Sequence, residues 1–282
     1  KLGPHAEPAV SRLQVALHRG LIGKEGVLLL EKIGTRRAIG GIAAALSHGA
    51  PEVKVAAAEA LARFGAKAEP ARPVLPATGT IRFAIYKESL GLQIGRAEHR
   101  WEFNEDGSYR LSAMTETSGL AALFKPVRME TESRGRMAPG GLQPETYRSL
   151  KNGRDANENA DFDWSTATVR LARDGSVRPI VPGTQDILSL NYQLAYLGQL
   201  AEGSSLGVVT GKKYERYALD SLGEEEIETP AGRFRTLHLR ALTDNITEIW
   251  IALDRQHLPV KIRFTDKKGE SFEQVATELG TP

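Results

Sequence analysis

The chain changes character across residues 72–86, which read RPVLPATGTIRFAIY. The first part of this stretch contains two prolines and a glycine and has the composition of a connector. The second part alternates between two sets of side chains, Ile81, Phe83 and Ile85 against Arg82, Ala84 and Tyr86. Such a period of two is typical of a half-buried β-strand. We therefore predict a boundary here, with one domain over residues 1–76 and a second over residues 77–282.

The composition differs on the two sides of this boundary. Residues 1–76 contain one of the 18 aromatic residues, Phe64, and carry 11 Lys and Arg against 6 Asp and Glu. The rest of the chain carries 26 basic against 29 acidic side chains. An Ala-rich segment without aromatic residues favours packed helices, whereas Tyr, Trp, Phe, Val and Thr favour strands. The sequence thus predicts an α+β protein with two domains, helical first and β second.

The overall composition excludes several classes of protein. The 282 residues are 41% hydrophobic and 26% charged, with a formal net charge of +2, as in an ordinary globular chain. The absence of cysteine excludes disulfides, thiolate metal sites, iron–sulfur clusters and a cysteine nucleophile. No run reaches the roughly 18 apolar residues of a membrane-spanning helix. The numbering begins at Lys1 without a charged-then-apolar leader, so we expect that a targeting peptide precedes it and has been removed.

The first domain shows an internal repeat. Three similar tripeptides recur at a spacing of 31 residues, namely Lys1-Leu2-Gly3, Lys32-Ile33-Gly34 and Arg63-Phe64-Gly65. This period predicts stacked helix pairs. The predicted apolar stripes are Val10, Leu13 and Leu17; Gly26, Leu29, Leu30 and Ile33; Ile39, Ile42 and Leu46; and Ala57, Ala60, Leu61 and Phe64. We expect a helix to begin at Pro51, and helices to stop at Gly34 and Gly65.

This segment resembles a HEAT-type α-solenoid, on Ala57-Ala58-Glu59-Ala60-Leu61 followed by Phe64-Gly65. The resemblance implies docking of a protein partner along an exposed ridge. Only two full repeats are visible, and the chain opens in the middle of a unit, so the solenoid is either shortened or capped by the second domain. Nucleic-acid binding is not predicted, because the segment lacks aromatic side chains that stack on bases.

The second domain predicts a long antiparallel meander. Gly-bearing turns separate the strand-like runs, at residues 104–107, 139–141, 173–175, 230–232 and 266–269. We expect about ten to twelve strands in a strongly curved antiparallel β-sheet or half-open barrel. Two short helices are predicted, over residues 120–124 and 184–197, the second with Thr184 as its N-cap. Its apolar face would plug the concave side of the sheet with Ile187, Leu190, Leu194 and Leu197.

An ordered series of motifs across residues 80–280 resembles the bacterial envelope family called domain of unknown function 3108. The motifs are Thr117–Phe124, Glu132–Gly135, Gly141–Pro144, Asp161–Asp163, Gly183–Ser189, Thr229–Gly232 and Leu258–Ile262. The resemblance implies a protein exported in Gram-negative bacteria, with a shape similar to the half-open barrels of periplasmic lipoprotein carriers. It implies no activity. The expected location is the periplasm or cell envelope, and the sequence leaves a cytoplasmic location open.

The sequence shows no catalytic or cofactor motif. None of its six histidines lies at metal-ligand spacing from another, and it lacks the HExxH, G-x-S-x-G, Walker and G-x-G-x-x-G patterns. We therefore predict no metal and no cofactor. Asp161 and Asp163 share a strand face, as an acid/base pair or as exposed carboxylates near a turn. Glu224-Glu225-Glu226 is interpreted as a solvated loop.

The candidate ligand-binding residues are Trp164, Asp186, Tyr192 and Tyr196. They could line a pocket between the 184–197 helix and the curled sheet, where barrels hold ligands. The competing interpretation is that Asp186 caps the helix and the aromatic rings pack in the core.

The resulting hypothesis is a non-enzymatic cell-envelope protein. A HEAT-like docking segment would present a curved β domain that binds a lipid-like or other apolar ligand, or a protein segment. One alternative is a structural assembly component without a small ligand. The other is an envelope hydrolase that uses Asp161, Asp163 or Asp186.

Overall fold

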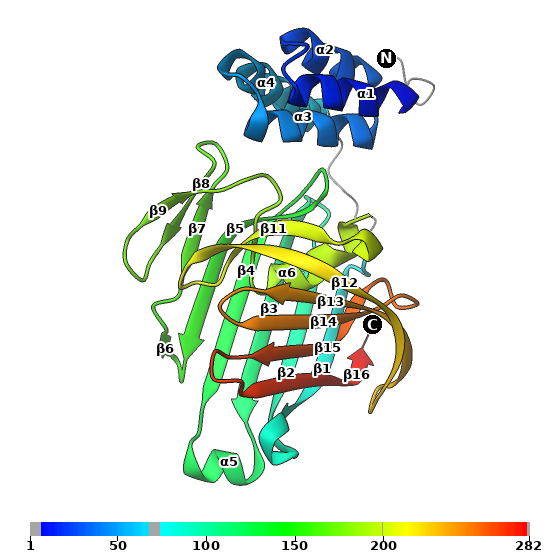
Figure 1. The fold of residues 1–282 in the computed structure, drawn as a ribbon. Helices are drawn as coiled ribbons and strands as arrows, with labels where there is room; N and C mark the ends of the chain where they lie inside the picture. The colour runs from blue at the N-terminus through cyan, green and yellow to red at the C-terminus, as the bar shows by residue number, and fades with distance from the viewer. Residues whose placement is uncertain (1–6, 68–73, 199, 281–282) are drawn as a thin grey trace. The chain divides into compact units, whose positions relative to one another are not determined.

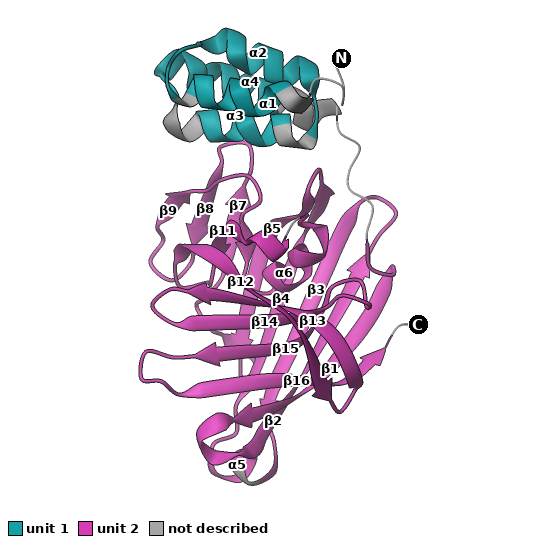
Figure 2. Cartoon of the chain, turned by 45° about the vertical axis from the view of Figure 1, so that its right-hand side comes forward, with its two compact units in different colours: residues 1–69 teal, residues 70–282 magenta. Residues whose placement is uncertain are grey.

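The computed structural model describes residues 7–67, 74–198 and 200–280 (Figure 1). The chain divides into two compact units, Lys1–Glu69 and Pro70–Pro282 (Figure 2). No helix in the described ranges combines the length and the apolar character needed to cross a membrane.

The first unit consists of short helices, α1 (Glu7–His18), α2 (Lys24–Ile33), α3 (Arg36–His48) and α4 (Pro51–Lys67). They bury a small aliphatic core that includes Val10, Val27, Leu30, Ile42 and Ala57. Helix α4 begins at Pro51 as predicted. Helix α2 ends at Gly34, which adopts a left-handed φ of 67°, a conformation that costs glycine little. The Ala-rich sequence thus forms helices whose stability depends on mutual packing.

Two predictions for the helical unit are wrong. Leu29 is exposed and Val27 is buried, so the buried face of α2 is rotated relative to the predicted stripe. Gly65 lies inside α4, because the Ala-rich sequence around it continues the helix to Lys67. The tripeptide Lys1-Leu2-Gly3 and the side chains of Leu46 and Phe64 lie outside the described residues.

The second unit is a 16-stranded sheet within the described residues. The strands are β1 (Thr78–Lys87), β2 (Leu92–Phe103), β3 (Ser108–Thr117), β4 (Arg128–Ala138), β5 (Gly141–Lys151), β6 (Arg154–Asp155), β7 (Ala160–Asp163), β8 (Thr168–Leu171), β9 (Val177–Pro179), β10 (Gln185–Asp186), β11 (Ser204–Val209), β12 (Tyr214–Thr229), β13 (Gly232–Leu242), β14 (Ile246–Ala252), β15 (Leu258–Thr265) and β16 (Ser271–Gly280). Their order is β10 to β16 in sequence, then β1 to β5, then β7, β8 and β9, with β6 paired only to β5. Every pair is antiparallel except β10 with β11.

The predicted curved antiparallel sheet is confirmed, and each of the five predicted turns lies between paired strands. The sheet has more strands than predicted because β6 to β10 contain only two to four residues each, and such short strands are difficult to recognise in a sequence. Glu224–Glu226 belong to β12, so their interpretation as a loop is wrong. Glu225 is held there by the indole N–H of Trp250, which donates to its carboxylate at 2.6 Å.

A short helical plug lies inside the curved sheet (Figure 1). It consists of α6 (Ser189–Gln193) followed by the 3₁₀ turn η3 (Leu194–Tyr196). Leu190 and Leu194 pack into an aliphatic cluster with side chains of β11, β13 and β14. Tyr192 packs into the second cluster, which the side chains of β1 to β5 dominate. The plug therefore joins the two walls of the sheet.

The predicted 184–197 helix is shorter than expected. Residues 185–186 form β10, which pairs with β11, and the helix begins only at Ser189. Thr184 is not the N-cap, since its hydroxyl donates to the carbonyl of Val181 at 2.7 Å. The apolar face holds, with Leu190 and Leu194 buried and Ile187 and Leu197 packed against them. The other predicted helix is confirmed as α5 (Gly119–Phe124).

Leu194→Ala tests the role of the plug. Leu194 is fully buried, so we expect the free energy of unfolding to fall by about 2–5 kcal/mol. Urea unfolding followed by tryptophan fluorescence measures this, because Trp101, Trp164 and Trp250 all lie in the second unit. Leu242→Ala, at an exposed position, is the matched control, with an expected change below about 0.5 kcal/mol. Equal effects of the two substitutions would contradict the plug.

Candidate functional site

Asp186 is fully buried at the start of the plug. One carboxylate oxygen accepts hydrogen bonds from the backbone N–H groups of Leu188 (2.9 Å) and Ser189 (2.8 Å). The other accepts from the hydroxyl of Ser133 on β4 at 2.5 Å. Asp186 thus satisfies backbone donors where α6 begins and ties that end of the helix to the sheet.

The polar chain continues inward from Ser133. Its hydroxyl oxygen lies 3.3 Å from that of Tyr109. Burial raises the pKa of Asp186 to about 6, although its hydrogen bonds lower it. Burial, followed by the negative charge of Asp186, raises the pKa of Tyr109 and of Tyr147. Asp186 is therefore an enclosed carboxyl group that exchanges a proton near pH 6.

Tyr192 occupies the other side of the plug. Its ring lies 5.9 Å from that of Trp101 and 6.3 Å from that of His99. Burial raises the pKa of Tyr192, and it lowers the pKa of His99 to about 4. Within the described residues, neither the Tyr192 hydroxyl nor Nδ1 of His99 has a hydrogen-bond partner. This part of the interior is thus closely packed around two uncharged polar groups.

Trp164 and Tyr196 are partly buried against the same core cluster as Tyr192. The indole of Trp164 donates to the carbonyl of Pro144 at 2.6 Å and stacks on Phe162. The hydroxyl of Tyr196 accepts from the backbone N–H of Val74 at 3.2 Å. The contacts of all four candidates are those of packing and capping, and their role in ligand binding stays a prediction.

An open hollow of about 280 Å³ lies in another part of the concave face. Its lining comes from six consecutive strands, β15, β16, β1, β2, β3 and β4, and from the residue before β4. The lining residues are Ile85, Ile94, Gly95, Thr115, Glu116, Thr117, Val127, Met129, Ile262, Phe264, Phe272 and Gln274. Strands five positions apart can line one hollow only if the sheet curls around it. The hollow therefore lies inside the curve, near α5.

The lining is mostly apolar and contains one unsatisfied acceptor. The side-chain oxygen of Gln274 is buried and has no hydrogen-bond partner among the described residues. At Gly95 a Cβ atom would lie 2.6 Å from the carbonyl oxygen of Glu116, so the close approach of β2 and β3 requires glycine. Sequence reasoning missed this site because its residues are spread over six strands without a motif.

A larger depression of about 600 Å³ lies on the convex face of β1 to β3. Its lining includes Arg82, Arg100 and Arg110. Each of these guanidinium groups is already paired with a carboxylate, of Glu98, Glu278 or Glu132. The arginine charges that line this depression are thus neutralised by neighbouring carboxylates.

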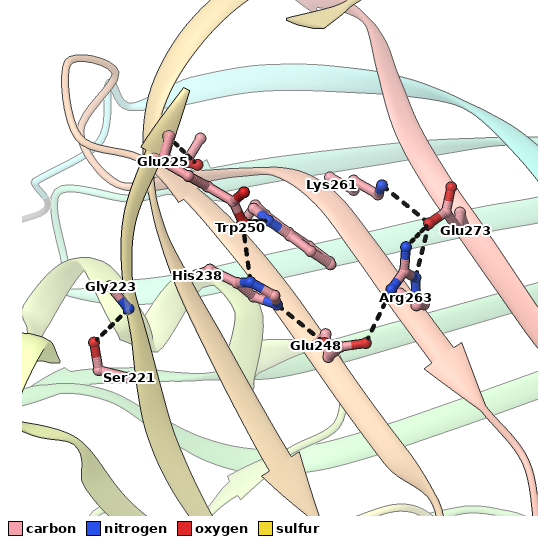
Figure 3. Close-up of polar contacts among 10 residues, drawn as sticks. Ser221, Gly223, Glu225, His238, Glu248, Trp250, Lys261, Arg263 and Glu273 are labelled. Carbon is pink, nitrogen blue, oxygen red and sulfur yellow. Dashed lines mark hydrogen bonds and ion pairs between the residues drawn. The ribbon is translucent and has the colours of Figure 1, made fainter. Parts of the chain in front are cut away.

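A second polar cluster lies on the convex face of β12 to β16 (Figure 3). His238 stacks on Trp250 with ring centroids 3.8 Å apart. Its ring nitrogens lie 3.0 Å from Glu225 and 3.1 Å from Glu248. Arg263 links Glu248 to Glu273, and Lys261 lies 4.8 Å from the centre of the Trp250 ring. The cluster connects the five strands β12 to β16, because each of its carboxylates contacts a basic side chain on a neighbouring strand.

Asp161 and Asp163 lie exposed on one face of β7, next to a turn. Asp161 pairs with Arg148, and Asp163 accepts from the hydroxyl of Ser165 at 2.6 Å. Asp186 is enclosed, so the three carboxylates do not share one environment. In the described part of the chain, no group of three or more His, Asp or Glu side chains is placed to hold a metal ion.

Asp186 and His99 are expected to change the free energy of unfolding with pH in opposite directions. Asp186 titrates near pH 6 when folded against an ordinary value of 3.8, so its contribution falls as the pH rises through this window. His99 titrates near pH 4 when folded against 6.5, so its contribution is lost as the pH falls through that window. These two contributions to the pH dependence of stability nearly cancel in the native chain.

When one of the two groups is replaced, the pH dependence of stability that the other group causes can be measured. We expect Asp186→Asn to give stability that rises from about pH 4 to about pH 6.5, and His99→Phe to give stability that falls, by up to about 3 kcal/mol in each case. Urea unfolding at a series of pH values measures both slopes. An Asp186→Asn variant with the pH profile of the native chain would show that this carboxyl is not enclosed.

Comparison with known proteins supplies the family. The family "Protein of unknown function (DUF3108)" matches residues 80–277, and no curated protein matches the chain. A β-barrel-like protein of DUF1849 from Brucella abortus is 9% identical, with a TM-score of 0.49 over 73% of this chain and 98% of that chain. MucB in the MucA/MucB complex of Pseudomonas aeruginosa is 15% identical, with a TM-score of 0.33 over 72% of this chain and 51% of that chain. The family match covers most of the second unit, and the chain belongs to the DUF3108 family.

Proposed function

We propose that the protein is a non-enzymatic cell-envelope protein that binds an apolar ligand in the hollow near α5. The observation that supports this is the hollow itself, about 280 Å³ of mostly apolar lining on the concave face. The plug fills another part of the concavity with Leu190, Tyr192 and Leu194. A curved sheet with an open apolar hollow on its concave face has the form of a binding site. A location in the periplasm or cell envelope is part of the proposal and rests on the family resemblance.

The size and chemistry of the hollow restrict the ligand. Its volume lies just below the range of roughly 300–1,000 Å³ that is usual for drug-sized ligands. This suits a section of one acyl chain better than a complete lipid. The side-chain oxygen of Gln274 is an acceptor without a partner among the described residues, and a buried acceptor without a partner is costly. The ligand class is therefore an acyl chain that carries a hydroxyl or an amide N–H.

The helical unit is proposed to be a HEAT-like docking segment for a protein partner, within the predicted domain of residues 1–76. A groove of about 490 Å³ between α1 and α3 supports this, with Gln14, Val15, Leu17 and Ala45 in its lining. Val15 is half exposed there. An exposed apolar side chain in a groove of small residues is typical of a surface that receives a helix.

Two alternatives differ in what the hollow does. In a structural assembly component it would remain empty, and the helical unit alone would make contacts. In an envelope hydrolase, Asp161, Asp163 or Asp186 would act on a substrate. The pairing of Asp161 with Arg148 and the enclosure of Asp186 favour the binding function.

A fluorescent acyl-chain probe, 11-(dansylamino)undecanoic acid, tests the binding function. We expect one probe to bind per chain, with a blue-shifted emission because the hollow excludes water. Thr115→Phe places a larger side chain in the hollow and should lower the affinity about tenfold or more, since lost volume and lost contact area both reduce binding.

Met114→Phe is the matched control for this experiment. Met114 is the neighbour of Thr115 on β3, so its side chain points to the opposite face. The control should bind the probe as the native chain does. Absence of probe binding by the native chain would favour the assembly component. Equal affinities for the two variants would place the probe elsewhere.

A further inference from the structure

Large apolar side chains gather in the open at one end of the β unit. Phe124 is 87% exposed and Leu123 is 78% exposed, both in α5. Leu90, in the connection between β1 and β2, is 56% exposed, and Leu92, the first residue of β2, is 60% exposed. These are the most exposed large apolar side chains described in the second unit. Exposure on this scale in neighbouring turns indicates a contact surface.

Hydrogen bonds place these connections together. The backbone N–H of Ser118, before α5, donates to the carbonyl of Ile94 on β2 at 2.9 Å. The turn after β15 belongs to the same end, because Glu270 pairs with Lys87 at 2.5 Å. Figures 1 and 2 show α5 beside the connection of β1 to β2 in both views. We call this surface, formed by residues 88–92, 118–128 and 264–270, the α5 face.

The α5 face is continuous with the hollow. Phe264 lines the hollow and is itself 42% exposed. Ile94 and Val127, also in the lining, lie within three residues of Leu92 and Phe124. A ligand that leaves the hollow here would therefore pass along the exposed apolar side chains.

Two exposed basic side chains beside the apolar tip, Lys125 and Lys268, have no carboxylate partner among the described residues. The connection of residues 118–128 contains Lys125 and Arg128 and no Asp or Glu, and the turn after β15 contains Lys267 and Lys268. Several other charges at this end are paired. Arg128 pairs with Glu130, and Lys267 pairs with Asp244. Glu116 and Glu270 pair with Arg96 and Lys87. Apolar side chains at a tip, with lysine and arginine beside them, match the interface of an anionic bilayer.

We propose that the α5 face docks on the surface of an anionic phospholipid bilayer. Leu123 and Phe124 enter the acyl region, and Lys125 and Lys268 contact the headgroups. The mouth of the hollow then faces the lipid. The apolar side chains sit on separate turns, which suits a fluid bilayer better than the continuous apolar core of a protein interface. Docking extends the proposed function by supplying the source of the acyl chain, but its test does not use the hollow.

Co-sedimentation of the full chain with vesicles tests the docking. We expect binding to vesicles of phosphatidylcholine with phosphatidylglycerol, and weaker binding to phosphatidylcholine alone. Leu123→Ser with Phe124→Ser should lower the partition coefficient about tenfold or more, because two large apolar side chains lose their burial. Lys125→Gln with Lys268→Gln should remove most of the preference for anionic vesicles.

The matched control is Val181→Ser with Leu242→Ser, at exposed positions of the same unit away from the α5 face. It should partition within about twofold of the native chain. Failure of the native chain to bind either vesicle, or native binding by the Leu123/Phe124 double variant, would overturn the proposal in favour of a protein partner. The Thr115→Phe variant separates the two proposals, because it should keep vesicle binding while it loses the acyl-chain probe.

Discussion

The packing of the plug between the two walls of the sheet is the contact on which the β unit depends. A sheet this long has one face turned inward, and that face must be covered or the apolar side chains of both walls would meet water. Leu190 and Leu194 cover one wall and Tyr192 covers the other. Asp186 holds the start of this segment against β4 through Ser133. A few residues thus bridge walls that come from opposite ends of the strand order.

The plug and the hollow divide the concave face between them. Where side chains from both walls reach the helix, the interior is closed, and burial favours the uncharged forms of His99 and Tyr192. Towards α5 the lining includes Gly95 and two threonines, which are too small to fill the space. On the convex face, paired charges and the stacked His238 and Trp250 stiffen the same strands. A stiff wall matters for binding because a hollow that collapses when empty must be reopened by its ligand.

Local patterns predicted the elements of the β unit well. The alternation around Ile81 and Phe83, and the glycines in the five turns, identified the long strands and their antiparallel pairing. The same reasoning failed for strands that are very short and for segments whose structure depends on tertiary contacts. Strands of two residues are too short to show a period. Glu225 lies in a strand because Trp250 donates a hydrogen bond to it. The helix begins only at Ser189 because Asp186 belongs to β10.

The site was less predictable than the fold. Asp186 and Tyr192 were predicted either to line a pocket or to cap the helix and pack in the core, and the structure buries both. The residues of the hollow are ordinary strand residues, and only the curl of the sheet brings them together. The exposed pair Leu123 and Phe124 was visible as part of a short helix, but its exposure depends on tertiary structure.

The ends of the strand order affect how copies of the chain meet one another. The described sheet terminates in β9, which has three residues, and β10, which has two. Pro179, the last residue of β9, has no amide hydrogen to offer to a further strand. Beyond these short strands, residues 220–229 of β12 pair with β13 but not with β11. This edge carries Glu224, Glu225 and Glu226, and charged side chains on an edge hinder the pairing of a further strand. The short terminal strands and the charged edge of β12 therefore protect a wide, open sheet against edge-to-edge association with other copies of the chain.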